Sequence, residues 1–300
     1  MTIETLHQPN YNSTMLGVVR GAADHYGIAL STPMLYGLSG HAWLINIHPQ
    51  LCPSGPYCYD CTPNCELLAG AGLATERLGF YGPDQGDTPR AEVEAKLRAE
   101  IDNGAACYLV NMEYQLLLGY DETGFITAQP WAPCVDFPPK HLTFDTWAEL
   151  GADIHLAFAV LRPVPAQPLA ESVAASLNYA ARIWSDPPAT GHYGFGPNAY
   201  DFWLQAVRDG HGASHGNWWN GTVYAECRQN AAAYLRELAT LYPTAAPLAT
   251  ELAEGYDQVH GWLVQAADKD LAVEPKIEVL TLAAAREREL APALLDLDLG

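Results

Sequence analysis

The stretch "NYNSTMLGVVRGAADHYG" (residues 10–27) predicts the helix around which the first half of the chain is organised. Asn12, Ser13 or Thr14 can cap its first turn, because short polar side chains accept hydrogen bonds from the free N–H groups there. An apolar stripe at helical spacing follows, and Tyr26-Gly27 closes the segment. For Thr14 taken by itself, a helix cap is the simplest interpretation.

Beyond this helix, the first half of the chain predicts a mixture of helices and strands, and the second half predicts helices only. The first half predicts an extended segment at 41–48, helices at 63–72 and 88–104, and strands at 76–82, 107–112, 114–121, 125–131 and 153–163. The second half predicts amphipathic helices at 169–184, 198–207, 220–242, 248–267 and 276–290. The Pro-rich segment 162–168 lies between them. We therefore predict a mixed α+β domain over residues 1–163 and an α-helical domain over 169–300.

Composition excludes several classes of partner. The net charge of −20 argues against nucleic acid and against anionic membrane surfaces, both of which select for Lys and Arg. No apolar run is long enough to cross a bilayer, and the first ten residues do not resemble a signal peptide. We expect a cytoplasmic protein without membrane or nucleic-acid partners.

Two stretches of the first half carry a resemblance to a known fold. They are the predicted first helix with "YGIALSTPMLYGLSGHAWLINIH" after it, and "YLVNMEYQLLLGYDETGFITAQP" further on. Their order and spacing resemble the papain-like fold, in its C39-like peptidase and butirosin BtrH N-terminal-like branches. The resemblance covers about residues 8–160 and implies a catalytic cysteine at the start of the helix, a histidine at the start of a strand, and an Asp or Asn before a proline.

The resemblance places all three catalytic positions on other residue types. Counting back from Gly27, the cysteine position falls on Thr14. The histidine position falls on Glu113, and the Asp or Asn position falls on Gln129, before Pro130. Gln8 precedes Thr14 at the spacing of the papain-type oxyanion glutamine. Thr14, Glu113, Gln129 and Gln8 are therefore the candidate catalytic residues.

Papain chemistry does not transfer to this set. A cysteine reacts as a thiolate, whereas a threonine hydroxyl needs a strong and well-placed base. Glu113 is a weak base unless burial raises its pKa, and the neutral Gln129 cannot stabilise a cation. We expect a retained scaffold without this chemistry, and the alternative is an amide hydrolase or acyltransferase that uses Thr14 or Cys52 as nucleophile.

Seven cysteines occur, and four of them cluster at Cys52, Cys58, Cys61 and Cys65. In an expected cytoplasmic chain, free thiols are favoured over disulfides. The Cys58-x-x-Cys61 spacing suits zinc, but no second pair of this kind follows, so we expect neither a metal nor another cofactor. Cys52, with His41 or His48 as its base, is the alternative nucleophile.

Two Gly-rich segments with aromatic residues, 191–203 and 210–222, are expected to be loops. We favour a packing role for their side chains, and the alternative is that they line a ligand site, because such loops often carry binding groups. The candidate ligand-binding residues are His41, Cys52, Tyr200, His211, His215 and Trp218. We thus predict a degenerate papain-like protein that binds a small-molecule or peptide-like ligand in a specialised biosynthetic pathway. A homodimer is left open.

Overall fold

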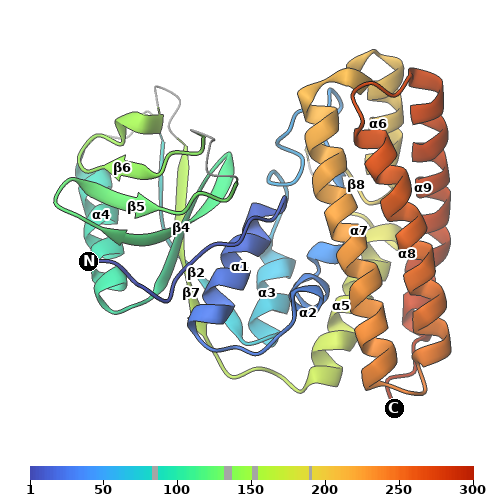
Figure 1. Ribbon diagram of the computed structural model, residues 1–300, viewed down its shortest axis with the longest axis horizontal. Helices are drawn as coiled ribbons and strands as arrows, with labels where there is room; N and C mark the ends of the chain where they lie inside the picture. Colours follow the sequence, from blue (N-terminus) through green and yellow to red (C-terminus); the bar gives the residue numbers. More distant parts are fainter. Residues whose placement is uncertain (83–86, 132–136, 151–154, 189–190) are drawn as a thin grey trace. The chain divides into compact units, whose positions relative to one another are not determined.

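A computed structural model describes residues 1–82, 87–131, 137–150, 155–188 and 191–300 (Figure 1). The chain is an α+β protein that divides into two compact units. Unit 1 comprises residues 1–30 and 72–166, and unit 2 comprises residues 31–71 and 167–300. The predicted boundary at the Pro-rich segment falls where unit 2 resumes, while residues 31–71 group with the C-terminal helices.

Unit 1 is built on a six-stranded antiparallel sheet with the order β2-β7-β3-β4-β5-β6. The strands are β2 (Leu73–Tyr81), β3 (Ala106–Asn111), β4 (Glu113–Tyr120), β5 (Gly124–Thr127), β6 (His141–Thr143) and β7 (Leu156–Pro163). A short 3-10 helix, η2 (Ala148–Leu150), follows β6. The pairing of β4 with β5 shifts register between Leu117 and Gly119, and such a bulge bends a strand.

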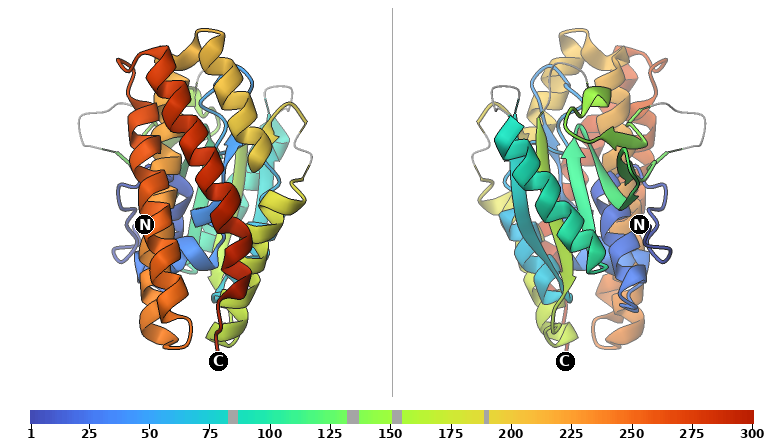
Figure 2. Two further views of the ribbon diagram at one scale, coloured as in Figure 1. Left: turned by 90° about the vertical axis from the view of Figure 1, so that its right-hand side faces the viewer. Right: turned by 90° about the vertical axis from the view of Figure 1, so that its left-hand side faces the viewer.

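Two helices cover the faces of this sheet. Helix α1 (Thr14–His25) packs on β3 and β4, and α4 (Asp87–Asp102) lies across the opposite face (Figures 1 and 2). The residues before α1 pass close to it because Gly17 and Gly21 have no side chains. A methyl group at Gly21 would lie 2.0 Å from the carbonyl oxygen of His7. Two glycines one turn apart thus allow this close approach.

Unit 2 is mainly helical. Its helices are α2 (Thr32–Leu38), α3 (Thr62–Gly70), α5 (Leu169–Ser185), α6 (Pro197–Arg208), α7 (His215–Leu241), α8 (Ala246–Ala267) and α9 (Val273–Ala293). Three 3-10 turns, η1 (His41–Trp43), η3 (His211–Ala213) and η4 (Leu294–Asp296), and a two-stranded pairing of β1 (Asn46–Ile47) with β8 (Gly194–Phe195) complete it. Helices α7, α8 and α9 are the longest helices described in unit 2, and α8 packs against both α7 and α9 (Figure 2).

A buried ion pair holds the centre of unit 2. The guanidinium group of Arg228 on α7 contacts the Glu287 carboxylate on α9, and both side chains are 1% exposed. Arg228 also donates to the carbonyl oxygens of Ala42 and Leu44, at 2.9 and 2.8 Å. This one residue therefore ties α7 to α9 and to the segment around η1. A charge so deeply buried is tolerated because hydrogen bonds satisfy it.

Most predicted elements are confirmed, with ends displaced by a few residues. The segment at 41–48 is a 3-10 turn followed by a two-residue strand, and the predicted strand at 125–131 ends at Thr127. Residues 153 and 154 of the last predicted strand lie outside the described ranges. Helix α2 and strand β6 were not predicted, because each is too short to show a clear apolar period.

The predicted loop at 210–222 is wrong. Only its first part is a turn, and α7 begins at His215, with the Ser214 hydroxyl accepting a hydrogen bond from the N–H of Asn217. The glycines inside α7 serve close packing rather than a turn. A methyl group at Gly216 would lie 1.6 Å from the carbonyl oxygen of Leu51, and one at Gly221 would lie 2.6 Å from the Cβ of Ala267.

Candidate functional site

Thr14 and Glu113 meet inside unit 1. Thr14 is the first residue of α1, follows the N-cap residue Ser13, and is fully buried. Its hydroxyl donates a 2.7 Å hydrogen bond to Glu113 Oε2 and accepts one of 3.1 Å from the N–H of Tyr114. The hydroxyl is therefore directed to β4, and the interpretation of Thr14 as the helix cap is wrong, since Ser13 occupies that position.

Gln8 lies against the same strand. Its side-chain amide donates to the carbonyl oxygen of Tyr114 at 2.9 Å and, more weakly, to that of Thr14 at 3.4 Å. Its carbonyl group accepts from the N–H of Leu116 at 2.8 Å. The Gln8 side chain thus forms hydrogen bonds with the backbone of β4 at Tyr114 and Leu116. Its N–H groups serve backbone carbonyls, whereas an oxyanion hole needs donors directed at a substrate oxygen.

Gln129 lies beyond the end of β5. Its amide nitrogen donates to the carbonyl oxygen of Pro138 at 3.0 Å, and its amide oxygen accepts from the N–H of Trp131 at 3.4 Å. These contacts hold the backbone at Trp131 and Pro138. The structure therefore brings three of the four predicted catalytic residues together, and gives the fourth backbone contacts of its own.

The chemistry open to this cluster is narrow. A carboxylate that accepts a hydrogen bond from a threonine hydroxyl has the arrangement of a base and a nucleophile. However, Thr14 exposes 0% of its surface and Glu113 exposes 5%. A substrate carbonyl carbon must approach the nucleophilic oxygen to about 3 Å before reaction. The packing around Thr14 leaves no surface for that approach, so the observed arrangement acts as a structural link between α1 and β4.

His41 and Cys52 belong to unit 2. His41 is buried, with Nδ1 3.1 Å from the Ser39 hydroxyl and Nε2 3.3 Å from the Tyr59 hydroxyl. Burial lowers the pKa of His41 to about 4, so the imidazole is neutral at pH 7. Cys52 is half-buried in a loop, where its carbonyl oxygen accepts from the Asn220 amide at 3.1 Å. The hydrogen bond from Asn220 thus joins this loop to α7.

Three other cysteines have thiol pKa values that depart from the ordinary value. The described cysteines are free thiols. Cys61 precedes the first turn of α3, and the hydrogen bond with the Cys65 thiol lowers its pKa to about 7. By contrast, burial raises the pKa values of Cys107 and Cys227 to about 12. Near neutral pH, Cys61 is therefore more available as a thiolate than the two buried cysteines, Cys107 and Cys227.

The four other predicted ligand residues do not converge. Tyr200 is buried, and its hydroxyl donates to Glu287 at 3.2 Å within the core of unit 2. His211 lies in η3, and His215 and Trp218 lie in the first turn of α7 with their rings 5.2 Å apart. The Trp218 ring is exposed, with the Lys269 ammonium group 5.3 Å away. Tyr200 serves packing, and the pair on α7 faces outward.

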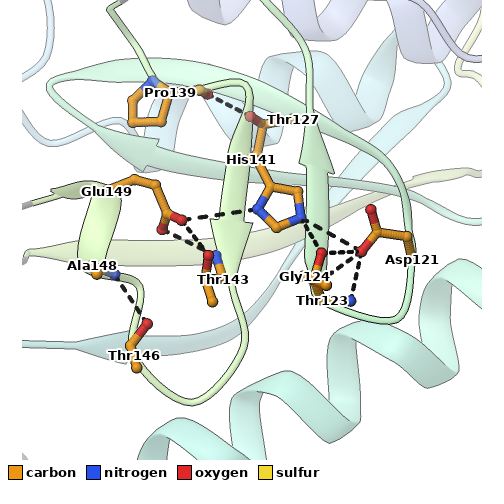
Figure 3. A network of polar contacts seen from close by, with 10 residues as sticks. All are labelled: Asp121, Thr123, Gly124, Thr127, Pro139, His141, Thr143, Thr146, Ala148 and Glu149. Carbon is orange, nitrogen blue, oxygen red and sulfur yellow. Dashed lines mark hydrogen bonds and ion pairs between the residues drawn. The ribbon is translucent and has the colours of Figure 1, made fainter.

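A polar cluster that the sequence did not predict surrounds His141 on β6 (Figure 3). The ring lies between Asp121, with Nε2 3.6 Å from Oδ1, and Glu149, with Nδ1 3.9 Å from Oε1. Thr123 donates to Asp121 at 2.6 Å and lies 3.2 Å from His141 Nε2. The cluster joins the turn between β4 and β5 to β6 and η2. In the sequence, only the short gap between the predicted strands 114–121 and 125–131 marks the turn that carries Thr123.

The carboxylates of this cluster are held in their charged forms. The hydrogen bonds from Thr123 keep the pKa of Asp121 well below its usual range. Partial burial raises the pKa of Glu149, but the hydrogen bonds from Thr143 outweigh this effect and lower it. Both groups are acceptors near neutral pH, as a turn and a sheet edge require.

Comparison with known proteins leaves the class of the chain open. No protein-family model matches it, and no curated protein matches it. Among the described residues, no helix has the length and apolar character needed to span a membrane. Within the same ranges, no group of three or more His, Cys, Asp or Glu side chains is arranged to hold a metal ion.

Proposed function

We propose that this chain has a papain-like scaffold without papain chemistry and binds a small or peptide-like ligand in a specialised biosynthetic pathway. The observation that supports this most directly is the burial of the Thr14 hydroxyl, which donates its hydrogen to Glu113 and accepts from the backbone of β4. A nucleophile must be open to its substrate, and this oxygen is not.

The neighbouring positions support the same proposal. Gln8 occupies the oxyanion position of the resemblance, and its side-chain amide forms hydrogen bonds with backbone groups of β4. Gln129, at the third position, holds the backbone at Trp131 and Pro138. Each substituted position thus has a structural use. In this proposal the helix and the strand of the fold are kept, and the residues at the catalytic positions have structural roles in place of catalytic ones.

The test is a search for covalent chemistry. The protein is incubated with a panel of acyl thioesters and activated amides, and its intact mass is followed. We expect no acyl adduct on Thr14 or Cys52 and no turnover above that of a Thr14→Val, Cys52→Ala double variant. A thermal-shift screen of small and peptide-like compounds runs in parallel, and at least one compound is expected to raise the melting temperature.

The opposite result is equally clear. An acyl group mapped to Thr14 or Cys52 by peptide mass spectrometry, and lost in the corresponding single variant, would make the chain an acyltransferase or amide hydrolase. Cys61→Ala is the matched control, because the pKa of the Cys61 thiol is lowered to about 7 and this thiol can acquire adducts without any catalytic role.

A further inference from the structure

A cavity lies between α3 and α5, entirely within unit 2. Its volume is about 540 Å³, and its walls include Leu67 on α3, Ser172 near the start of α5, and Leu295 on η4. Small-molecule sites have volumes of about 300–1,000 Å³ and combine apolar walls with a few placed polar groups. The size and the mixed lining therefore suit a ligand of one or two amino-acid residues.

Two opposite charges face this cavity from different helices. Glu66 comes from α3 and Arg182 from α5. The two are not paired with each other within 4.0 Å, and neither side chain forms an ion pair or hydrogen bond elsewhere in the described part of the chain. Unpaired charges at the border of a cavity are free to bind charged groups of a ligand.

The cation is held in position. The Arg182 guanidinium group lies 5.9 Å from the centre of the Tyr179 ring, within the range of a cation–π contact. Tyr179 itself is buried, and its hydroxyl donates to Asn64 Oδ1 at 3.0 Å. Asn64 in turn donates to the carbonyl oxygen of Ser39 at 2.8 Å. This chain of contacts fixes the ring that supports the guanidinium.

The two walls are also tied to each other. The carbonyl oxygen of Gly70, at the end of α3, accepts hydrogen bonds from the N–H of Gln167 at 2.9 Å and from the hydroxyl of Ser172 at 3.2 Å. The helix that carries Glu66 is thereby joined to the helix that carries Arg182. A pre-organised site of this kind loses less conformational entropy when it binds a ligand.

We propose that this cavity binds a zwitterionic ligand, a free amino acid or a short peptide, with its carboxylate on Arg182 and its ammonium group on Glu66. Arginine forms paired hydrogen bonds with a carboxylate, and an exposed carboxylate attracts an ammonium group. The apolar side chain of the ligand lies against Leu67 and Leu295. A zwitterion also avoids the repulsion that a net charge of −20 exerts on an anionic ligand.

This inference rests on the proposed ligand-binding function and names its site and ligand class. The test is isothermal titration calorimetry of the full chain with leucine, phenylalanine and leucyl-leucine. The blocked analogues N-acetyl-leucine and leucinamide each lack one of the two charges. Binding of at least one free compound is expected, with an affinity loss of about tenfold or more for both blocked forms.

Variants with single substitutions test whether the ligand binds in this cavity. Arg182→Gln and Glu66→Gln are each expected to weaken binding by about tenfold or more, because each removes one charge contact. Arg208→Gln and Glu251→Gln change exposed residues outside the cavity and are expected to bind like the wild type. Melting temperatures of the variants show whether all of them are folded.

Three results would overturn the inference: no binding by any free compound at about 10 mM, equal binding of the blocked analogues, or unchanged affinity in the Arg182 and Glu66 variants. These failures differ from a failure of the proposed function. That proposal falls on an acyl adduct at Thr14 or Cys52, which the titration does not measure, and it stands if a different compound class binds.

Discussion

The Thr14 hydroxyl donates a 2.7 Å hydrogen bond to the Glu113 carboxylate, and this bond joins the first turn of α1 to the start of β4. The two residues are far apart in sequence and nearly or fully buried. A hydroxyl and a carboxylate at these positions would be expected in a reactive pair if a substrate could reach them. Buried as they are, they form a polar link within the core of unit 1.

Replacing Thr14 by valine is expected to destabilise the protein. The substitution keeps the shape but removes the donor to Glu113 and the acceptor for the N–H of Tyr114. The loss of these buried hydrogen bonds should lower the free energy of unfolding in urea by about 1–3 kcal/mol. Thr14→Ser keeps the hydroxyl and is the control. Equal stability of wild type and Thr14→Val would show that the link carries no weight.

Two helical glycines are expected to respond in opposite directions to alanine. A methyl group at Gly21 would lie 2.0 Å from the carbonyl oxygen of His7, so Gly21→Ala forces the first residues away from α1 and lowers stability by about 1–3 kcal/mol. Gly261, in α8, has no atom within 4 Å of the added methyl group. Gly261→Ala should raise stability by about 0.5–1 kcal/mol. Urea denaturation measures both, and a Gly21→Ala variant that is as stable as the wild type or more stable would contradict the packing described at α1.

The stability of the protein is expected to depend on pH through His41. Burial lowers its pKa from 6.5 to about 4 in the folded protein. Between these values the unfolded chain binds a proton that the folded chain does not, so stability falls as the pH is lowered through this window. The full contribution is on the order of 3 kcal/mol.

The measurement is the free energy of unfolding at pH values from 7 down to 4, in wild type and in His41→Asn. The variant should lose the His41 part of the slope, whatever its stability at pH 7. His215→Asn, at an exposed position, should keep the wild-type slope. A slope that is unchanged in His41→Asn would mean that folding does not lower the pKa of His41.

Alkylation is expected to select Cys61. With its pKa lowered to about 7 by the Cys65 thiol, Cys61 should react with iodoacetamide faster than Cys107 and Cys227, whose pKa values burial raises to about 12. Cys65→Ala should slow the reaction of Cys61 at pH 7 by about tenfold, since only the thiolate attacks. Cys58→Ala is the control. Peptide mass spectrometry gives the rates, and an unchanged rate in Cys65→Ala would remove the hydrogen bond as the cause.

Breaking the buried ion pair of unit 2 is expected to cost more than any exposed pair. Arg228→Met leaves the Glu287 carboxylate without its buried partner, at a cost of about 3–5 kcal/mol. The double variant Arg228→Met, Glu287→Leu should recover part of this loss. Arg236→Met breaks the exposed pair with Asp257 and should cost less than about 1 kcal/mol. Chemical denaturation compares the three, and equal losses would place the Arg228 pair in a solvated environment.

Part of the candidate site could be predicted from the sequence, and part could not. Counting along the resemblance brought Gln8, Thr14 and Glu113 into one cluster, and the structure places them within hydrogen-bonding distance of a shared strand. The burial of Thr14 was not predictable, because a threonine at the start of a helix is found both exposed and buried. The position of Glu66 and Arg182 on the walls of one cavity had no sequence signal at all.

The sequence by itself determined the α+β class and most helices and strands, because their apolar periods are local. Helix α4, strand β4 and helix α8 follow from residues within a single window. Tertiary structure alone decided the role of Gly216 and Gly221, which look like loop residues but let α7 pack closely. It also decided that the Thr14 hydroxyl points inward. Both depend on atoms distant in the chain, and local propensity carries no information about them.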